Sequence, residues 1–222
     1  MRVGWVVTGG LDRSGRERVI PALVWCLERL SRTHDVHVFA LHHDPEPDTY
    51  DLAGSRVHNL GHVSAPPGLR RAAERRRLAE AVARVGGLHL LHAYWGMPAI
   101  IAAPVAASQR LPLIVTADSG EFVSLPDIAY GLQRRWSIRR ALQQALAEAH
   151  DVTVCSEFMR QQAAAHGIDA RVIPLGVPHD YALGPGDDPV MQSRTPDRPP
   201  EGPPWRATRS LRRPGRTCHS RW

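Results

Sequence analysis

Short apolar runs alternate with helical patterns from residue 3 to residue 175. The runs are rich in aliphatic and β-branched residues, as buried strands of a parallel sheet are; they are residues 3–7, 35–41, 55–60, 88–93, 113–117, 151–155 and 171–175. Apolar residues recur at helical spacing over residues 19–30, 68–85, 133–150 and 156–166. The alternation predicts an α/β fold with a doubly wound, mainly parallel, Rossmann-like sheet of seven strands.

Composition divides the chain into two regions. Residues 1–178 carry the alternating pattern and are expected to form one domain. Residues 179–222 are expected to be a linker and a disordered tail, because the stretch from residue 184 onward is rich in proline and arginine and has few aliphatic residues with which to bury a core.

The positive charge of the protein is concentrated in this tail. Residues 187–222 hold eight arginines and four acidic residues, which account for +4 of the net charge of +6. The preceding domain is therefore almost balanced, and a nucleic-acid partner is not expected. The chain has no lysine, which excludes Schiff-base chemistry and a lysine-dependent phosphate loop.

The beginning of the chain and its hydropathy indicate a cytoplasmic protein. Met1 and Arg2 lead directly into the first strand pattern, without the segments of a secretory signal peptide. No apolar run is long enough to cross a membrane. The three cysteines are scattered, so neither a disulfide framework nor a zinc cluster is expected.

Candidate site residues follow three of the predicted strands, since a doubly wound sheet binds ligands at the carboxyl ends of its strands. Gly9 and Gly10 follow the first strand, where a backbone can approach a substrate closely and donate N–H groups to an anion. The alternative is that these glycines only make the turn.

Two further loops of this kind follow the strands at 88–93 and 113–117. After the first of them, His92, Trp95 and Gly96 form a corner that could hold a hydroxyl-rich ligand, with Trp95 as a stacking surface and with free N–H groups at the start of the next helix. Asp118 and Glu121 follow the second, where two carboxylates suit chemistry or hydroxyl recognition. A core histidine, a packing tryptophan and a capping Asp118 are the structural alternatives.

No metal site and no cofactor are expected. His42, His43 and Asp44 offer three ligands in succession, but nearby prolines indicate an exposed turn and no fourth ligand is evident. Gly10 to Glu17 resembles a phosphate loop but has arginine and glutamate where the motif needs lysine and a hydroxyl residue. The dinucleotide fingerprint is also missing.

One predicted helix carries a cluster of arginines. Arg70, Arg71, Arg75, Arg76 and Arg77 are interspersed with acidic residues in the helical pattern at 68–85. The cluster is either an ordinary solvated face or a surface for anionic lipid, so peripheral contact with the inner face of a membrane through residues 70–77 stays open.

The order of these pieces resembles the amino-terminal, acceptor-side domain of retaining glycosyltransferases of the GT-B fold, in the family 4 group. The matching stretches are residues 9–10, 90–96, 112–116, 152–156 and 172–177. The resemblance implies an enzyme that transfers a sugar from a nucleotide sugar to a sugar or lipid-linked acceptor. It also implies that Gly9 and Gly10 approach the donor phosphates, and that Asp118 and Glu121 lie near the reacting sugar or acceptor.

The resemblance covers residues 1–178 and does not extend to a donor-binding domain. The family's pair of glutamates eight positions apart is not found, and the catalytic residues are therefore unknown. We expect a chain truncated before that domain, with an arginine-rich end produced by a frameshift or a wrongly assigned gene end, and inactive alone. The alternative is a non-enzymatic binding or assembly module of Rossmann-like fold.

Overall fold

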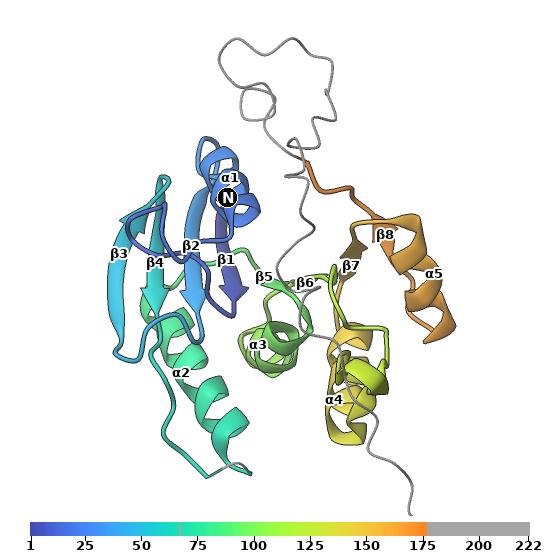
Figure 1. Ribbon diagram of the computed structural model, residues 1–222. Coiled ribbons are helices and arrows are strands. Elements are labelled where there is room, and N and C mark those ends of the chain that lie inside the picture. Colours follow the sequence, from blue (N-terminus) through green and yellow to red (C-terminus); the bar gives the residue numbers. More distant parts are fainter. Residues whose placement is uncertain (67, 177–222) are drawn as a thin grey trace, which may run out of the picture. The chain divides into compact units, whose positions relative to one another are not determined.

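A single eight-stranded sheet forms the centre of the part of the chain that the computed structural model describes, residues 1–66 and 68–176 (Figure 1). The strands are β1 (Arg2–Val7), β2 (Asp35–Ala40), β3 (Asp48–Leu52), β4 (Ser55–Asn59), β5 (Leu90–Tyr94), β6 (Leu113–Thr116), β7 (Asp151–Val154) and β8 (Arg171–Val172). Their order across the sheet is β3-β4-β2-β1-β5-β6-β7-β8, and every neighbouring pair except β3 and β4 is parallel. The predicted α/β fold with a mainly parallel sheet is confirmed.

The eighth strand, β3, was not predicted from the sequence. Tyr50 and Leu52 are buried and Asp51 between them is exposed, as expected for an edge strand with one covered face. Ala53 and Gly54, both at positive φ, make the two-residue turn that pairs β3 with β4 in an antiparallel hairpin.

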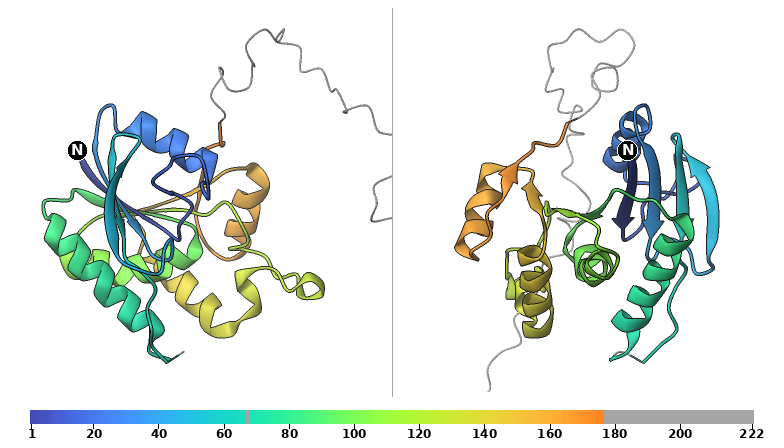
Figure 2. Two further views of the ribbon diagram at one scale, coloured as in Figure 1. Left: turned by 60° about the vertical axis from the view of Figure 1, so that its left-hand side comes forward. Right: turned by 180° about the vertical axis from the view of Figure 1, so that it is seen from behind.

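Helices cover both faces of the sheet. They are α1 (Pro21–Leu30), α2 (Arg70–Val85), α3 (Gly96–Gln109), α4 (Trp136–Ala147) and α5 (Glu157–Ala165). Helix α1 packs on one face with residues of β1, β2 and β4, whereas α2, α3 and α4 lie on the opposite face (Figures 1 and 2). The predicted N-cap Ser156 is confirmed, because its side chain accepts a hydrogen bond from the Met159 N–H at the start of α5.

The chain order of the strands reverses between β1 and β5. From β1 the chain proceeds to β2 on one side, and it later returns to β5 on the other side. Loops that leave adjacent strands in opposite directions open a crevice at the carboxyl end of the sheet. The crevice here is bordered by the loops after β1, β5 and β6, which contain Gly9, Trp95 and Asp118.

The predicted linker and tail, residues 179–222, lie outside the described residues, as does Val177. Across residues 1–66 and 68–176, no helix combines the length and the hydropathy that crossing a bilayer requires.

Candidate functional site

A cavity of about 370 Å³ opens at the carboxyl ends of β1 and β5, the reversal point of the sheet. Thr8 of the loop after β1 lines one side and Trp95 lines another. The remaining wall comes from the long loop after β6, with Ser119, Glu121 and Tyr130 among its lining residues. The cavity therefore combines aromatic surface with hydroxyl groups at the place where α/β sheets of this topology bind ligands.

Trp95 is held in an uncommon backbone conformation. Its φ of 76° is a region that bulky residues rarely adopt, and its indole Nε1 donates a 2.6 Å hydrogen bond to Asp118 Oδ1. The hydroxyl of Tyr94 donates to the other oxygen, Asp118 Oδ2, at 2.7 Å. Burial, reinforced by the bond to Asp118, raises the pKa of Tyr94, so this residue is a hydroxyl donor near neutral pH. One carboxylate thus fixes two neighbouring aromatic side chains.

Glu121 joins the loop after β6 to the start of α3. Only 2% of this residue is exposed. Its Oε1 accepts the Gly96 N–H at 2.9 Å, and its Oε2 accepts the Ser119 N–H at 2.8 Å. Burial raises the pKa of Glu121, although the two backbone hydrogen bonds oppose the change. The Gly96 N–H, predicted to be free for a ligand, is instead engaged by Glu121, because a buried carboxylate needs donors.

Gly96 is required at this corner by packing. A Cβ atom there would lie 2.8 Å from Leu132 Cδ1 and 2.9 Å from Glu121 Cγ. The absence of a side chain lets the loop after β6 close over the start of α3. Gly96 therefore contributes to the shape of the site through close approach.

The outer wall of the cavity is a folded loop that periodicity did not predict. Leu125 and Tyr130 pair their backbones, and Gly131 follows at a φ of 101°. Ser119 Oγ and Tyr130 Oη are 3.1 Å apart, so two hydroxyl groups meet at the rim. Sequence reasoning missed Tyr130 because it lies between short 3₁₀ turns; the Tyr-Gly pair before the next helix was the available signal.

His92 does not line this cavity. Its Nε2 lies 2.8 Å from Thr116 Oγ1, which in turn lies 2.8 Å from Thr153 Oγ1. Burial lowers the pKa of His92 to about 4, so the ring is neutral near pH 7. The residue lines a second cavity, of about 430 Å³, between α1 and residues 173–176. The structure therefore separates His92 from Trp95, although the two are close in sequence.

The glycine turn after β1 is closely packed against the loop after β2. A Cβ atom on Gly9 would lie 3.3 Å from the Cα atom of His43, and Gly10 has a φ of 82°. The Gly10 N–H points to His43 Nδ1 at 3.4 Å, while its carbonyl oxygen accepts the Ile20 N–H at 2.8 Å. Gly9 is therefore required by the close approach of His43, and Gly10 by its positive φ. Their proposed approach to donor phosphates stays a prediction.

The arginines of α2 are largely engaged within the protein. Arg77 donates to the carbonyl oxygens of Leu60 and His62, both at 3.0 Å, and Arg75 donates to the carbonyl oxygen of Ile100. Arg70 and Arg76 each pair with a glutamate four residues later on the helix. These partners leave fewer free cationic groups than the sequence suggested, and membrane contact stays a prediction.

Comparison with known proteins adds a family and a fold. The family model described as Glycosyltransferase Family 4 matches residues 13–181. No curated protein sequence matches the chain significantly. Among solved structures, sucrose-phosphate synthase from Thermosynechococcus elongatus superposes with a TM-score of 0.57 at 16% identity over 79% of this chain and 48% of its own.

A second similar structure is Anabaena Alr3699/HepE in complex with UDP-glucose. It superposes with a TM-score of 0.53 at 14% identity, over 80% of this chain and 44% of its own. At these identities the likeness shows the fold. The chain spans about half the length of the two solved relatives.

Proposed function

This chain belongs to glycosyltransferase family 4, and we propose that residues 1–176 form the acceptor-side half of an enzyme that transfers a sugar from a nucleotide-sugar donor. The cavity at the ends of β1, β5 and β6 would receive the acceptor. The observation that carries the proposal is Trp95, a residue that lines this cavity, has a strained φ and has its indole Nε1 held by Asp118.

The chemistry of the cavity suits a hydroxyl-rich ring. A tryptophan face offers an apolar surface for the C–H face of a sugar, and the hydroxyls of Ser119 and Tyr130 can exchange hydrogen bonds with its hydroxyl groups. Backbone strain at a site is paid for by its surroundings and is concentrated where ligands bind. Glu121, with both oxygens engaged by backbone N–H groups, is assigned a positioning role.

The donor would bind to a second domain that faces this edge of the sheet. HepE, a structural relative, was solved with UDP-glucose bound, and this is the basis for proposing a nucleoside diphosphate sugar here. Gly9 and Gly10 would approach the donor phosphates, and transfer would proceed with retention at the anomeric carbon. The donor side would neutralise the leaving diphosphate, so we expect no turnover by the described domain alone.

The competing function is a binding or assembly module without catalysis. The observation that favours it is that the oxygens of Asp118 and Glu121 are all engaged by donors within the protein. Titration with nucleotide sugars distinguishes both of these functions, the acceptor-side half and the binding module, from an enzyme that binds its donor without a partner. Under our proposal the protein binds these donors only weakly, and sub-millimolar binding without a partner would contradict the assignment of donor binding to another domain.

The acceptor site is tested by isothermal titration of the full chain with a panel of monosaccharides and alkyl glycosides. Trp95→Phe keeps an aromatic ring but loses the bond to Asp118, and it should weaken binding by about tenfold. Trp136→Phe is the matched control, since Trp136 is exposed on α4 outside the cavity. Equal loss in both variants, or no loss in Trp95→Phe, would refute the acceptor site.

We retain as part of the proposal a cytoplasmic location with peripheral membrane contact through α2. The supporting feature is Arg71, a half-buried residue of α2 that has no ion pair among the described residues, whereas Arg70 and Arg76 of the same helix are already paired. Arg71→Ala should lower co-sedimentation with vesicles that contain phosphatidylserine. Unchanged co-sedimentation would remove α2 from that account.

A further inference from the structure

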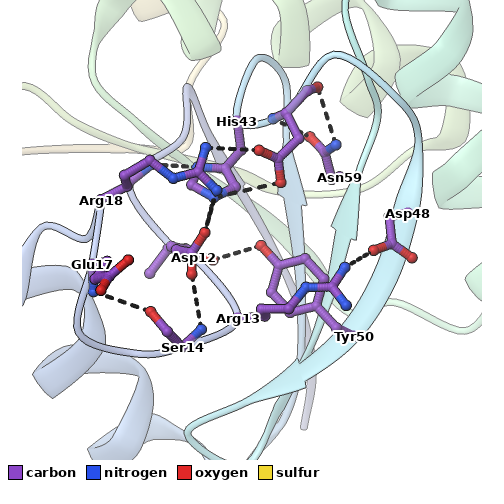
Figure 3. Close-up of polar contacts among 12 residues, drawn as sticks. Asp12, Arg13, Ser14, Glu17, Arg18, His43, Asp48, Tyr50 and Asn59 are labelled. Atoms are coloured by element: carbon purple, nitrogen blue, oxygen red, sulfur yellow. Dashed lines mark hydrogen bonds and ion pairs between the residues drawn. The ribbon is translucent and has the colours of Figure 1, made fainter.

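A compact group of charged side chains lies in the loops after β1 and β2, outside the cavity described above (Figure 3). We name Asp12, His43 and Asp44, together with Arg18 that contacts both aspartates, the Asp–His cluster. One ligating atom from each of Asp12, His43 and Asp44 lies within 4.8 Å of the other two. The three atoms are therefore close enough to converge on one ion after a modest contraction.

The imidazole of His43 is directed into this cluster and is unsatisfied. Its side chain is only 4% exposed, and its Nε2 is buried without a hydrogen-bond partner among the described residues. The nearest carboxylate atoms are Asp12 Oδ2 at 3.5 Å and Asp44 Oδ2 at 3.8 Å. His43 Nε2 is one of seven such buried atoms in the described part of the chain, and it lies near two carboxylates.

The two carboxylates are held in place by other contacts. Asp12 Oδ1 accepts the Ser14 N–H at 2.9 Å, which directs Oδ2 toward His43. The backbone of Asp44 is bound on both sides by Asn59, through the Asp44 N–H and the Asp44 carbonyl oxygen.

We propose that Asp12, His43 and Asp44 form a binding site for a divalent transition-metal ion such as Zn²⁺ or Mn²⁺, and that Arg18 is the cation that closes this site in the metal-free protein. The sequence shows His43 and Asp44 side by side, but the third ligand, Asp12, comes from the preceding loop. The proposal is independent of the glycosyltransferase assignment.

The ligand set and its spacing suit this class of ion. An imidazole nitrogen favours Zn²⁺ and its neighbours in the transition series, whereas carboxylates also accept Mn²⁺. At metal–ligand distances of about 2.0–2.2 Å, tetrahedral ligands are about 3.3–3.6 Å apart. The distances of 3.5 and 3.8 Å from His43 Nε2 to the two carboxylate atoms need only a small contraction.

Arg18 forms ion pairs with both carboxylates from the solvent side of the cluster. Its guanidinium donates to Asp12 Oδ2 and, at 2.9 Å, to Asp44 Oδ1. The Arg18 side chain is 61% exposed, whereas the side chains of Asp12 and Asp44 are 11% and 29% exposed, so the guanidinium reaches the two carboxylates from water. An arriving metal ion can therefore displace the guanidinium into water and take over the neutralisation of the two aspartates.

Metal binding also requires a change of tautomer at His43. The contact between the Gly10 N–H and His43 Nδ1 makes Nδ1 an acceptor, which leaves the ring proton on Nε2 in the neutral, metal-free form. Coordination through Nε2 moves this proton to Nδ1 and breaks the 3.4 Å contact. Since the Gly10 N–H and the new Nδ1–H are both donors, the ring or the glycine turn must also shift to separate them.

The test measures Zn²⁺ and Mn²⁺ binding by isothermal titration of the full chain, with Co²⁺ absorption and ¹H–¹⁵N spectra of the histidine rings as further readouts. His43→Ala and the shape-conserving Asp44→Asn should each weaken binding by about tenfold or more. His42→Asn is the control for binding to another histidine of the same loop, and it should bind as the parent does. The ring spectra should show the His43 proton move from Nε2 to Nδ1.

Arg18→Ala gives the sharpest outcome, because removal of a competitor should tighten binding by about tenfold. Arg13→Ala is its matched control: Arg13 belongs to the same loop, is 62% exposed and pairs with Asp48 instead. This control measures how much the metal affinity changes when one positive charge is removed without removing a contact to Asp12 or Asp44. Equal tightening in the two arginine variants, unchanged binding in both Asp44→Asn and His43→Ala, or no metal binding by the parent would each overturn the proposal.

Discussion

Carboxylates lie in two regions of the sheet, at the ends of β5 and β6 and at the ends of β1 and β2. The two regions differ in the groups that bind these carboxylates. At β5 and β6, Asp118 accepts from two aromatic side chains, and both oxygens of Glu121 accept backbone N–H groups. At β1 and β2, Asp12 and Asp44 are neutralised by an exposed arginine, and a buried ring nitrogen of His43 has no partner in the part of the chain that the structure describes.

The difference shows that carboxylates on one sheet can serve either to hold the structure together or to bind a cation. A carboxylate whose oxygens all have buried donors is part of the framework, and its removal leaves donors unsatisfied. A carboxylate neutralised from solvent can exchange that partner for another cation at little cost. The first region should therefore respond to mutation through stability, and the second through binding.

The largest expected effect comes from the wall of the cavity. In Gly131→Ala the new Cβ would lie 2.0 Å from the carbonyl oxygen of Val123, at a φ of 101°. The free energy of unfolding should fall by about 3 kcal/mol or more. Gly167→Ala is the control, because φ there is also positive but no atom lies within 4 Å of the added carbon; it should cost about 1 kcal/mol. If urea denaturation gave equal losses of unfolding free energy for the two variants, the loop around Gly131 would have to move and accommodate the new Cβ atom.

A smaller loss is expected when the carboxylate that holds Trp95 is neutralised. Asp118→Asn replaces one acceptor oxygen with a donor and removes the charge, so Tyr94 and Trp95 can no longer both donate to a carboxylate. Unfolding by urea should show a loss of about 1.5–3 kcal/mol. Asp127→Asn, on the exposed part of the same loop, should stay within about 0.5 kcal/mol of the parent. A loss no larger than that of the control would mean that Asp118 does not organise the corner.

The contribution of Glu121 to the unfolding free energy can be measured from its pH dependence. Because burial raises its pKa, the folded state keeps a proton that the unfolded state loses from pH 4.5 upward. Its contribution to stability is complete below that pH and is lost as pH rises through the folded pKa. The stability of the parent relative to Glu121→Gln should therefore fall as the pH rises above about 4.5. A difference that is flat or rises with pH would contradict the burial of this charge.

The smallest expected effect lies in the second region. Arg13→Ala removes an exposed ion pair with Asp48, and the loss of unfolding free energy should stay below about 1 kcal/mol. A loss as large as that of Asp118→Asn would remove the distinction between the two regions.

Much of the fold could be predicted from the sequence because its central strands are continuous apolar runs, such as residues 3–7 and 113–117, bounded by turn residues. The edge strand β3 was missed, since only Tyr50 and Leu52 of its five residues are buried and a short alternating run resembles a loop. Periodicity locates elements that pack on a core and says little about edges.

The candidate site could be predicted only where it follows strand ends. Trp95, Gly96, Asp118 and Glu121 were found because each follows an apolar run, and the structure brings them together. His92 was placed with them because it is near in sequence, but alternation along β5 directs its ring to another cavity. Tyr130 and the contact between Asp12 and His43 depend on how loops fold against one another, which residue spacing does not encode.

The most direct test of the acceptor site is an NMR measurement of where a bound sugar lies on the isotope-labelled full chain. With the tightest-binding glycoside of the titration panel, we expect intermolecular NOEs to the indole of Trp95 and the ring of Tyr130, which line the cavity at the ends of β1 and β5. NOEs to His92 and Trp5, in the cavity beside α1, without any to Trp95 would contradict the account.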